Sequence, residues 1–412
     1  ISPFTITIAQ AELDDLQHRL EQTRFAAQLP AATATSTPVP IPRPTATPTP
    51  TPSPTPAPAP QTPNDDWQFG VPTNYLEELA TYWRTHYDWR AAERELNQYP
   101  QFTTVIDGQN IHFLHIRSAE TGATPLLLTH GWPGSFVEFL GVVPPLTDPV
   151  RHRGQASEAF DVVIPSIPGF GFSSPVSGND WSTARIATTW LELMTRLGYD
   201  RFGVQGGDLG ASISPEVARL APDRVIGVHV NGSLGMPVWA LSDDEKLSLT
   251  ELERDRVARV EAFMQNEFGY IAIQSTRPQT IAAALVDSPV GQLAWIVDKF
   301  REWTYPHEAL PDTVIGRDRL LTNVMIYWLT RTASSAAWVG YAQPASWGEP
   351  KVASGVPTAA IMFAHDVGIR RYAERENTIV RWSDVDHGGH FAALEQPALL
   401  VDDLRAFFGS LR

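Results

Sequence analysis

The sequence predicts an α/β protein whose mostly parallel, doubly wound sheet carries an inserted helical cap. Between residues 101 and 231, short apolar runs that suit buried strands alternate with stretches of helical periodicity. From about 235 to 332 the chain is mostly helical, and strand-like sequence returns after residue 357. Strands that alternate with helices of roughly 10–15 residues form parallel sheets covered by helices. The helical block between the two halves of this pattern therefore indicates a cap or lid.

Composition narrows the class of protein. The 412 residues are enough for one large domain with additions. The net charge of −15 argues against nucleic acid or an anionic membrane as a main partner, and the absence of cysteine excludes disulfides and thiolate catalysis. No apolar run approaches the roughly 20 residues that span a bilayer, and the N-terminus lacks a signal-peptide pattern. We therefore expect no membrane anchor and a cytoplasmic location, and the composition leaves a homodimer open.

We predict that residues 1–99 form a separate N-terminal segment with an unusual insertion. Residues 38–63 hold 12 of the 35 prolines, and alternating Thr-Pro and Ala-Pro pairs cannot form a helix or a sheet ladder. We expect an extended, solvated linker there, with a docking ligand for a proline-binding module as the alternative. Helical spacing predicts a helix over 11–23 before the linker and one or two amphipathic helices over 74–93 after it.

The first half of the core is predicted over residues 100–234. The run 101–117 alternates like a β-hairpin, and Asp107-Gly108 suits its turn. Continuous apolar runs bounded by glycine or proline indicate buried parallel strands. These runs span 125–131, 159–169, 201–207 and 224–231, and helices are expected between them at 183–198 and 211–220.

The cap is predicted over residues 235–345 and the second half of the core over 346–412. Helical stretches in the cap lie at 242–268, 287–303 and 317–332. Two strands, at 358–364 and 377–382, and a final helix at 397–408 complete the sheet.

A nucleophile elbow is indicated by VQGGDLGAS, residues 204–212. Asp208 follows a predicted strand and precedes a predicted helix, which is the context such an elbow needs. Gly206 and Gly210 leave the tight turn the room that side chains would fill. The carboxylate would then project over the carboxyl ends of the strands, where α/β proteins bind ligands. The alternative is a helix N-cap aspartate without a catalytic role.

A carboxylate at this position suits chemistry at a saturated carbon. Aspartate can attack an sp³ carbon, displace a leaving group and leave an alkyl ester on the enzyme, which water then hydrolyses. Asp208 needs no base for the first step because a carboxylate is already ionised at neutral pH. Strained epoxides and carbon–halogen bonds are the substrates that this chemistry indicates.

The second step needs a base, and DHGGHFAALEQP offers two histidines. His390 lies in a glycine-rich loop that enters a helix, about 180 residues after the nucleophile, as the order nucleophile–acid–histidine requires. His387 is interpreted as a surface neighbour. The acid that orients the base should end a strand between the two, and Asp366 in IMFAHD does so. Asp384 and Asp386 are rivals that lie too close to His390 in sequence.

The proposed chemistry also needs hydrogen-bond donors that stabilise the negative charge formed on oxygen in each step. The loop THGWPG follows a predicted strand, and the Trp132 and Leu209 backbone N–H groups would form an oxyanion hole. Opening an epoxide also needs a proton donor, and a neutral tyrosine suits that role. The cap offers Tyr270, Tyr327 and Tyr341. PGFGFSS lacks the remainder of a phosphate loop and is interpreted as a structural turn.

Taken together, the ordered motifs make the chain resemble the microsomal-type epoxide hydrolases. These motifs are HGWPGSFVEFL, PSIPGFGFSS, GGDLGASI, IQSTRPQT, DSPVGQLAWIVDKF, LLTNVMIYW and GGHFAALEQP, and the resemblance covers most of 3–29 and 67–410. It implies an α/β-hydrolase fold with a helical cap and an N-terminal segment that wraps the molecule. It also implies conversion of epoxides and water to vicinal diols with no cofactor and no metal.

By motif, the resemblance implies Asp208 as nucleophile, His390 as base and Asp366 as the orienting acid. Tyr270 matches the family's first ring-opening tyrosine. The second tyrosine is expected 13 residues after Tyr327, where Gly340 stands, so Tyr341 fits only with a one-residue shift.

Two further departures concern the pocket and the acid motif. The family's usual tryptophan after the nucleophile is Leu209 here, which keeps the backbone donor and removes an aromatic wall. The usual proline of the acid motif is Ala364.

Two other functions compete with epoxide hydrolysis. A haloalkane or haloacid dehalogenase shares the aspartate nucleophile, although it needs halide-binding donors rather than tyrosines. A catalytically silent ligand-binding protein of the same fold would bind a small molecule without turnover, and the joint presence of Asp208, Asp366 and His390 argues against it.

Overall fold

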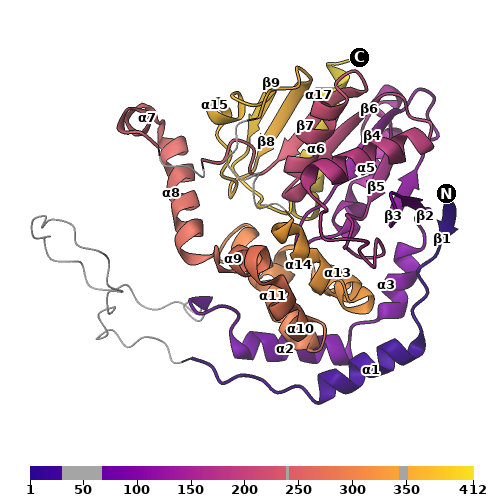
Figure 1. Ribbon diagram of the computed structural model, residues 1–412, viewed down its shortest axis with the longest axis vertical. Coiled ribbons are helices and arrows are strands. Elements are labelled where there is room, and N and C mark those ends of the chain that lie inside the picture. Colours follow the sequence, from indigo (N-terminus) through magenta and orange to yellow (C-terminus); the bar gives the residue numbers. More distant parts are fainter. Residues whose placement is uncertain (30–66, 238–240, 343–350) are drawn as a thin grey trace, which may run out of the picture.

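A nine-stranded sheet forms the upper part of the molecule in Figure 1, and the cap and N-terminal helices lie below it. The computed structural model describes residues 1–29, 67–237, 241–342 and 351–412, so the linker predicted at 38–63 lies outside the described residues. The strands run in the order β1-β2-β3-β5-β4-β6-β7-β8-β9. Their bounds are β1 (Ser2–Phe4), β2 (Gln101–Ile106), β3 (Gln109–Ile116), β4 (Thr124–Thr129), β5 (Phe160–Pro165), β6 (Phe202–Gly206), β7 (Val225–Asn231), β8 (Pro357–Met362) and β9 (Thr378–Asp384).

The sheet is antiparallel at one edge and parallel elsewhere. Strands β1, β2, β3 and β5 pair antiparallel in turn, whereas every pair from β5 through β4 to β9 is parallel. The β2–β3 hairpin turns at Asp107 and Gly108, whose φ angles of 49° and 74° are the positive values that a tight hairpin turn requires. The predicted α/β-hydrolase fold, with its mostly parallel sheet, is confirmed.

Helices around the sheet close the core. The main ones are α5 (Thr183–Arg196), α6 (Leu209–Leu220) and α17 (Pro397–Gly409), and the short ones are α4 (Val143–Thr147), α15 (Arg370–Ala373) and α16 (Ala392–Glu395). Consecutive leucines at 126–128 in β4 are all buried, as expected for a strand covered on both faces. The α17 aromatics Phe407 and Phe408 lie so close to β7 and β6 that Gly227 and Gly203 leave no room for a Cβ atom.

The cap lies between β7 and β8 and consists of helices (Figure 1). These are α7 (Asp243–Ser248), α8 (Glu251–Asn266), α9 (Gly269–Thr276), α10 (Pro278–Leu285), α11 (Pro289–Trp303), α12 (Pro311–Val314), α13 (Arg317–Thr330) and α14 (Ala333–Tyr341). In the described part of the chain no single helix is long and apolar enough to cross a membrane. The bent pair α10 and α11, at 118° to one another, passes that test by length and composition alone.

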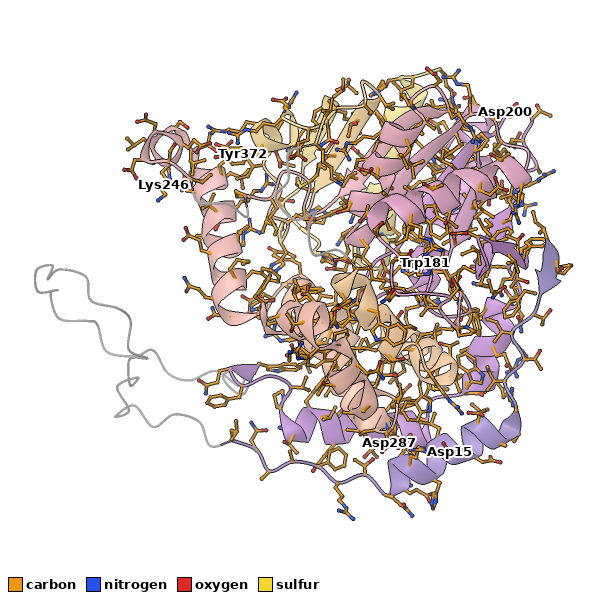
Figure 2. The ribbon with its side chains drawn as sticks, in the orientation of Figure 1. Asp15, Trp181, Asp200, Lys246, Asp287 and Tyr372 are labelled. Carbon is orange, nitrogen blue, oxygen red and sulfur yellow. The ribbon has the colours of Figure 1, made fainter. Side chains whose placement is uncertain are left out.

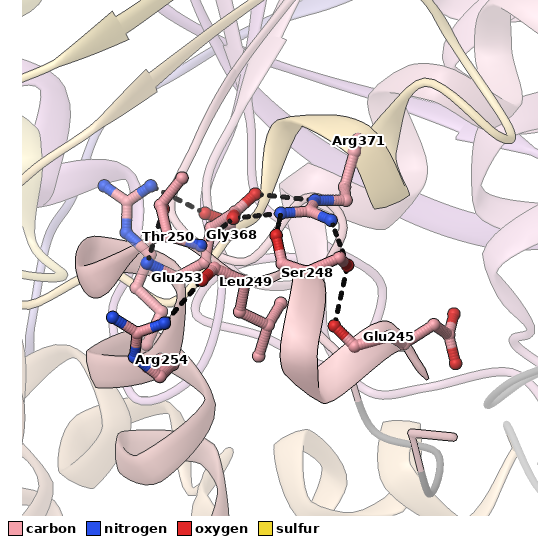
Figure 3. A network of polar contacts seen from close by, with 9 residues as sticks. Glu245, Ser248, Leu249, Thr250, Glu253, Arg254, Gly368 and Arg371 are labelled. Atoms are coloured by element: carbon pink, nitrogen blue, oxygen red, sulfur yellow. Dashed lines mark hydrogen bonds and ion pairs between the residues drawn. The ribbon is translucent and has the colours of Figure 1, made fainter. Parts of the chain in front are cut away.

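Helix α8 is tied to the core by arginines (Figure 3). Arg371 of α15 donates to Glu253 and to Ser248, so both ends of the α7–α8 turn are held. Arg256 is 4% exposed and donates to the Gly368 carbonyl at 3.0 Å and to Asp384 at 2.6 Å. Gly368 lies just before α15, and Asp384 is the last residue of β9. These contacts therefore hold α8, at one end of the cap, against the core.

The N-terminal segment contacts both the sheet and the cap. It comprises β1, α1 (Gln10–Glu21), α2 (Thr73–Thr85) and α3 (Trp89–Leu96). Arg19 bridges Asp15 on its own helix and Asp287 of the cap, and Figure 2 shows the two aspartates together along the lower edge of the molecule. The Ile6 N–H donates to Oδ1 of the Asn97 side chain at 2.9 Å, and Nδ2 of the same side chain donates to the Ile6 carbonyl at 2.8 Å. The segment therefore runs from the sheet edge to the far side of the cap.

Candidate active site

The turn from β6 into α6 places Asp208 at the carboxyl end of the parallel strands. Its backbone has φ 54° and ψ −118°, an unfavourable conformation for a residue with a side chain that costs on the order of 1–3 kcal/mol. Neighbouring glycines leave the turn its space: a Cβ at Gly206 would lie 2.4 Å from Gly210, and one at Gly210 would lie 2.1 Å from the Thr129 carbonyl. These are the contacts of a nucleophile elbow.

The Asp208 carboxylate points toward the loop after β4 rather than onto its own helix. Asp208 is the N-cap of α6, yet its side chain makes no capping hydrogen bond. Instead Oδ1 accepts the Trp132 backbone N–H at 2.9 Å. Gly131 packs directly against the carboxylate, where a Cβ atom would lie 2.2 Å from Oδ1. The helix-cap alternative is therefore unsupported by this geometry.

The second backbone donor adjoins the nucleophile. Leu209 is the first residue of α6, so its N–H belongs to the helix-terminal donors that lack an intrahelical partner. The Leu209 N–H is therefore a candidate for the second donor, beside that of Trp132, in the predicted oxyanion hole.

His390 faces the nucleophile across a very small space. Its Nε2 lies 3.6 Å from Asp208 Oδ2, and its backbone N–H donates to the Trp303 carbonyl at 2.9 Å. A cavity of about 10 Å³, close to the size that one water molecule needs, is lined by Asp208, His390, Glu138 and neighbouring residues. Burial lowers the pKa of His390, and the Asp208 charge opposes that shift. The imidazole is therefore neutral at pH 7, as a general base must be.

Asp366 lies in the loop after β8, next to the loop that carries His390. Backbone hydrogen bonds from Ala364 and His365 to His387 and Gly388 join the two loops. The carboxyl is 5% exposed, and Oδ2 accepts the Phe363 N–H at 2.8 Å. Within the described ranges no hydrogen bond connects Asp366 to His390. Burial raises the pKa of Asp366 to about 7, and the Phe363 N–H partly offsets this.

The two rival acids and the second histidine have other partners. Asp384 pairs with Arg256 of α8 at 2.6 Å. His387 is half exposed and pairs with the fully exposed Asp386 at 2.7 Å. None of the three faces Asp208.

The three cap tyrosines occupy different environments. Tyr270 in α9 stacks on Trp132, with ring centroids 4.9 Å apart and planes 14° apart, and burial and the nearby Asp208 raise its pKa well above 10. Tyr327 is buried, and its hydroxyl donates to the Gly134 carbonyl at 2.6 Å, which holds the loop of the oxyanion hole. Tyr341 ends α14 and is 48% exposed. Of the two expected ring-opening tyrosines, the structure places Tyr270 against the site and leaves Tyr341 at the surface.

Sequence reasoning missed several residues beside the nucleophile. Glu138 lines the cavity, and burial together with the Asp208 charge raises its pKa well above the usual range. Trp303 and Lys299, both in α11, contact Tyr270. Glu138 and Lys299 stand in motifs that carried the family resemblance, HGWPGSFVEFL and DSPVGQLAWIVDKF, whereas Trp303 lies three residues after the second motif. A place in a family motif was a signal for Glu138 and Lys299, but no residue spacing indicated a chemical role for any of the three residues.

A metal centre finds no support in the described ranges, where no three His, Asp or Glu side chains gather in a geometry that could hold an ion. The groups at the site are carboxylates, an imidazole, a phenol and backbone donors. These suit nucleophilic substitution and proton transfer.

Comparisons with known proteins agree on one family. The family model for the epoxide hydrolase N terminus matches residues 49–139, and the model for the alpha/beta hydrolase fold matches 124–282. Epoxide hydrolase 1 of Sus scrofa is 34% identical over 100% of this chain and 89% of its own length.

Two solved structures resemble the whole molecule. The juvenile hormone epoxide hydrolase from the silkworm Bombyx mori has a TM-score of 0.83 at 28% identity, covering 100% of this chain and 94% of that one. The Aspergillus niger epoxide hydrolase has a TM-score of 0.81 at 30% identity, covering 100% and 96%.

Proposed function

Because the chain belongs to the microsomal-type epoxide hydrolase family and is an enzyme that hydrolyses epoxides, we propose that it does so through a covalent ester on Asp208. The substrates are an epoxide and water, and the product is a vicinal diol. The observation that carries the assignment is the position of Asp208: a strained elbow turns its carboxylate toward a backbone donor and within 3.6 Å of His390.

In the first step Asp208 attacks a ring carbon of the epoxide. A bond forms between a carboxylate oxygen and that carbon, the carbon–oxygen bond of the ring breaks, and the ring oxygen takes a proton from Tyr270. The strain of the three-membered ring supplies much of the driving force. Tyr270 suits the donor role because its raised pKa keeps the hydroxyl protonated throughout the neutral range. Tyr341 would take part only if the end of α14 turned inward.

In the second step water attacks the carbonyl carbon of the Asp208 ester. His390 takes one proton from the water, and the Trp132 and Leu209 N–H groups stabilise the oxyanion that forms. Collapse of this intermediate breaks the ester bond, and the second proton of the attacking water passes to the departing alkoxide to complete the diol. The proton held by His390 returns to the Tyr270 oxygen, so both Asp208 and Tyr270 are restored. Asp366, in the adjoining loop, would orient the imidazole and balance its charge.

The first test is the intact mass of the His390→Gln variant after incubation with aryl and alkyl epoxides. Without the base, the enzyme should gain the mass of one whole epoxide and stall, and peptide mapping should place the adduct on Asp208. An adduct formed from haloalkanes alone, with release of halide, would instead support a dehalogenase. An adduct on another residue would refute Asp208 as the nucleophile.

A further inference from the structure

A buried lysine lies over the ring of the proposed proton donor. The Lys299 ammonium is 5.1 Å from the Tyr270 ring centroid and 5.8 Å from that of Trp303. The residue is 5% exposed, and its Nζ pairs at 2.9 Å with Asp298, the preceding residue in the chain. Burying an ammonium group is costly unless its surroundings compensate, and here the Asp298 carboxylate supplies that compensation.

The surroundings of Tyr270 are otherwise aromatic and negative. Trp132 stacks on its ring, Trp303 contacts the ring edge-on at 5.6 Å, and Phe263 does so at 6.5 Å. The acidic groups that act on the phenol are Asp208 and Glu267, and each raises its pKa. Glu267 accepts the Trp303 indole N–H at 2.9 Å, and burial raises the pKa of Glu267 to about 7.

This environment opposes the reaction that the phenol must carry out. When Tyr270 gives its proton to the opening ring, negative charge develops on the tyrosine oxygen. A nearby carboxylate disfavours that charge, whereas a cation close to the ring favours it, and the effect is large where water is excluded. Lys299 is the cation whose contact with the Tyr270 ring the structure records.

We propose that Lys299 is a positioning residue for ring opening: its ammonium group stabilises the developing tyrosinate on Tyr270 and thereby speeds transfer of the phenolic proton to the epoxide oxygen. The proposal rests on the ring-opening role of Tyr270 proposed above. The proton that Tyr270 gives up is restored by the one that His390 removes from water.

The test isolates the first step in a His390→Gln background, where the ester accumulates. Lys299→Met keeps the length and apolar stem of the side chain and removes the charge, and Lys299→Arg keeps the charge. Alkylation of Asp208 by styrene oxide and by 1,2-epoxyhexane is followed by rapid quench and intact mass between pH 6 and 9. We expect Lys299→Met to slow alkylation by about tenfold, with recovery of most of the rate in Lys299→Arg. The loss should be larger for the aliphatic epoxide, whose ring opening depends more on protonation.

Three controls separate the effect of charge from that of packing. Arg412→Met removes a cation that lies 6.0 Å from the Phe160 ring, far from the site, and should alkylate at the parent rate. In a Tyr270→Phe background no phenolic proton is transferred, so adding Lys299→Met should cause no further loss. In the enzyme with His390 intact, hydrolysis of the preformed ester should be unchanged by Lys299→Met.

The outcomes distinguish this inference from the function on which it rests. Equal alkylation rates in Lys299→Met and its parent, with Tyr270→Phe slowed, would overturn the role of Lys299 and leave the mechanism standing. Failure of Lys299→Arg to recover any rate, with the melting temperature lowered in both variants, would show a packing role instead. If Tyr270→Phe alkylates at the parent rate, the assignment of Tyr270 itself fails.

Discussion

Asp208 combines a strained backbone with a side chain held by a single donor. Its φ of 54° and ψ of −118° lie outside the left-handed helical region, so an asparagine there would carry the same backbone strain as the aspartate. Asp208→Asn should therefore fold normally, because the amide oxygen can still accept the Trp132 N–H. We expect turnover to fall by at least about 10⁴-fold, since an amide is a very poor nucleophile. Steady-state diol formation, with the melting temperature as the check on folding, measures this. Substantial turnover that is not explained by deamidation would contradict the nucleophile.

The pH profile follows from three shifted groups. The pKa of His390 is lowered below 6.5, so the base is neutral above that range and becomes protonated only in more acidic solution. The pKa of Tyr270 is raised well above 10, so the donor stays protonated in mildly alkaline solution. Because the orienting acid Asp366 ionises at about pH 7, the rate of ester hydrolysis should rise as the pH increases through 7 and be flat from about pH 8 to 9. A fall in this rate on going from pH 7 to 9 would contradict these assignments.

Asp366 should cost stability as the pH rises. Its folded pKa of about 7 exceeds the usual value of 3.8, so the folded state binds more protons than the unfolded state between these values. The stability that this group contributes is present below pH 4 and is lost as the pH rises through 7. Asp366→Asn should therefore melt at a similar or higher temperature than the parent at pH 8, whereas this advantage should shrink near pH 5. Diol formation should fall by about 10²-fold or more if the carboxylate orients His390.

The site could be predicted from sequence to the extent that chain order determines it. Asp208, His390 and Asp366 each follow a strand, and the carboxyl ends of parallel strands share one edge of the sheet. Chain order could not show which cap tyrosine faces the site, because the face that a cap helix turns toward the core depends on how the helix packs. Lys299 and Glu138 were missed for the same reason: each reaches the site from a helical segment that has no catalytic spacing of its own.

At the level of elements, helix ends decide how the cap is built. The predicted helix over 242–268 is divided at Leu249 and Thr250 into α7 and α8, and each helix begins with a capping box, Ser242 with Glu245 and Thr250 with Glu253. Both boxes are visible in the sequence as S/T-x-x-E, so this break could have been predicted. The Arg256 contact with Gly368 and Asp384 could not, because it joins residues more than 100 positions apart.

The tether between α8 and the core gives a prediction at this scale. Arg256→Met removes a buried cation and leaves the Gly368 carbonyl without that donor, and we expect a loss of about 2 kcal/mol in the free energy of unfolding. The matched control is Arg370→Met, whose exposed pair with Glu374 at 2.7 Å should contribute less than about 0.5 kcal/mol. Urea denaturation of both variants measures the difference. Equal losses would show that the α8 tether adds no more than a surface ion pair.

Across the whole molecule, the N-terminal segment joins the edge of the sheet to the cap. Its two described pieces meet beside the insertion: the Thr73 N–H donates to Gln28 at 2.7 Å, and the Thr73 hydroxyl donates to the Ala26 carbonyl at 3.1 Å. The family comparison predicted such a wrapping segment, whereas its partners, such as Asp287 on the cap, emerge only from the folded structure.

The insertion should be dispensable for the fold because the chain on either side of it is already in contact. Replacing residues 38–63 with a five-residue Gly-Ser linker should leave kcat/KM within about twofold. It should raise the free energy of unfolding by about 0.5–1 kcal/mol, because a shorter loop costs less entropy to close. Diol formation and urea denaturation of the shortened chain provide the measurements. A large loss of activity would indicate that the proline-rich stretch contributes a contact of its own.

Trp303 limits how freely this pocket can be redesigned. Its carbonyl accepts the His390 N–H, its indole N–H donates to Glu267, and its ring contacts both Tyr270 and His390. An engineer who seeks selectivity for bulkier epoxides would be drawn to so large a side chain near the reacting groups. A smaller side chain at position 303 would disturb the contacts of both Tyr270 and His390. A wider range of substrates would therefore come with slower ring opening and slower ester hydrolysis. Libraries aimed at new substrates should therefore hold position 303 constant and vary the cap elsewhere.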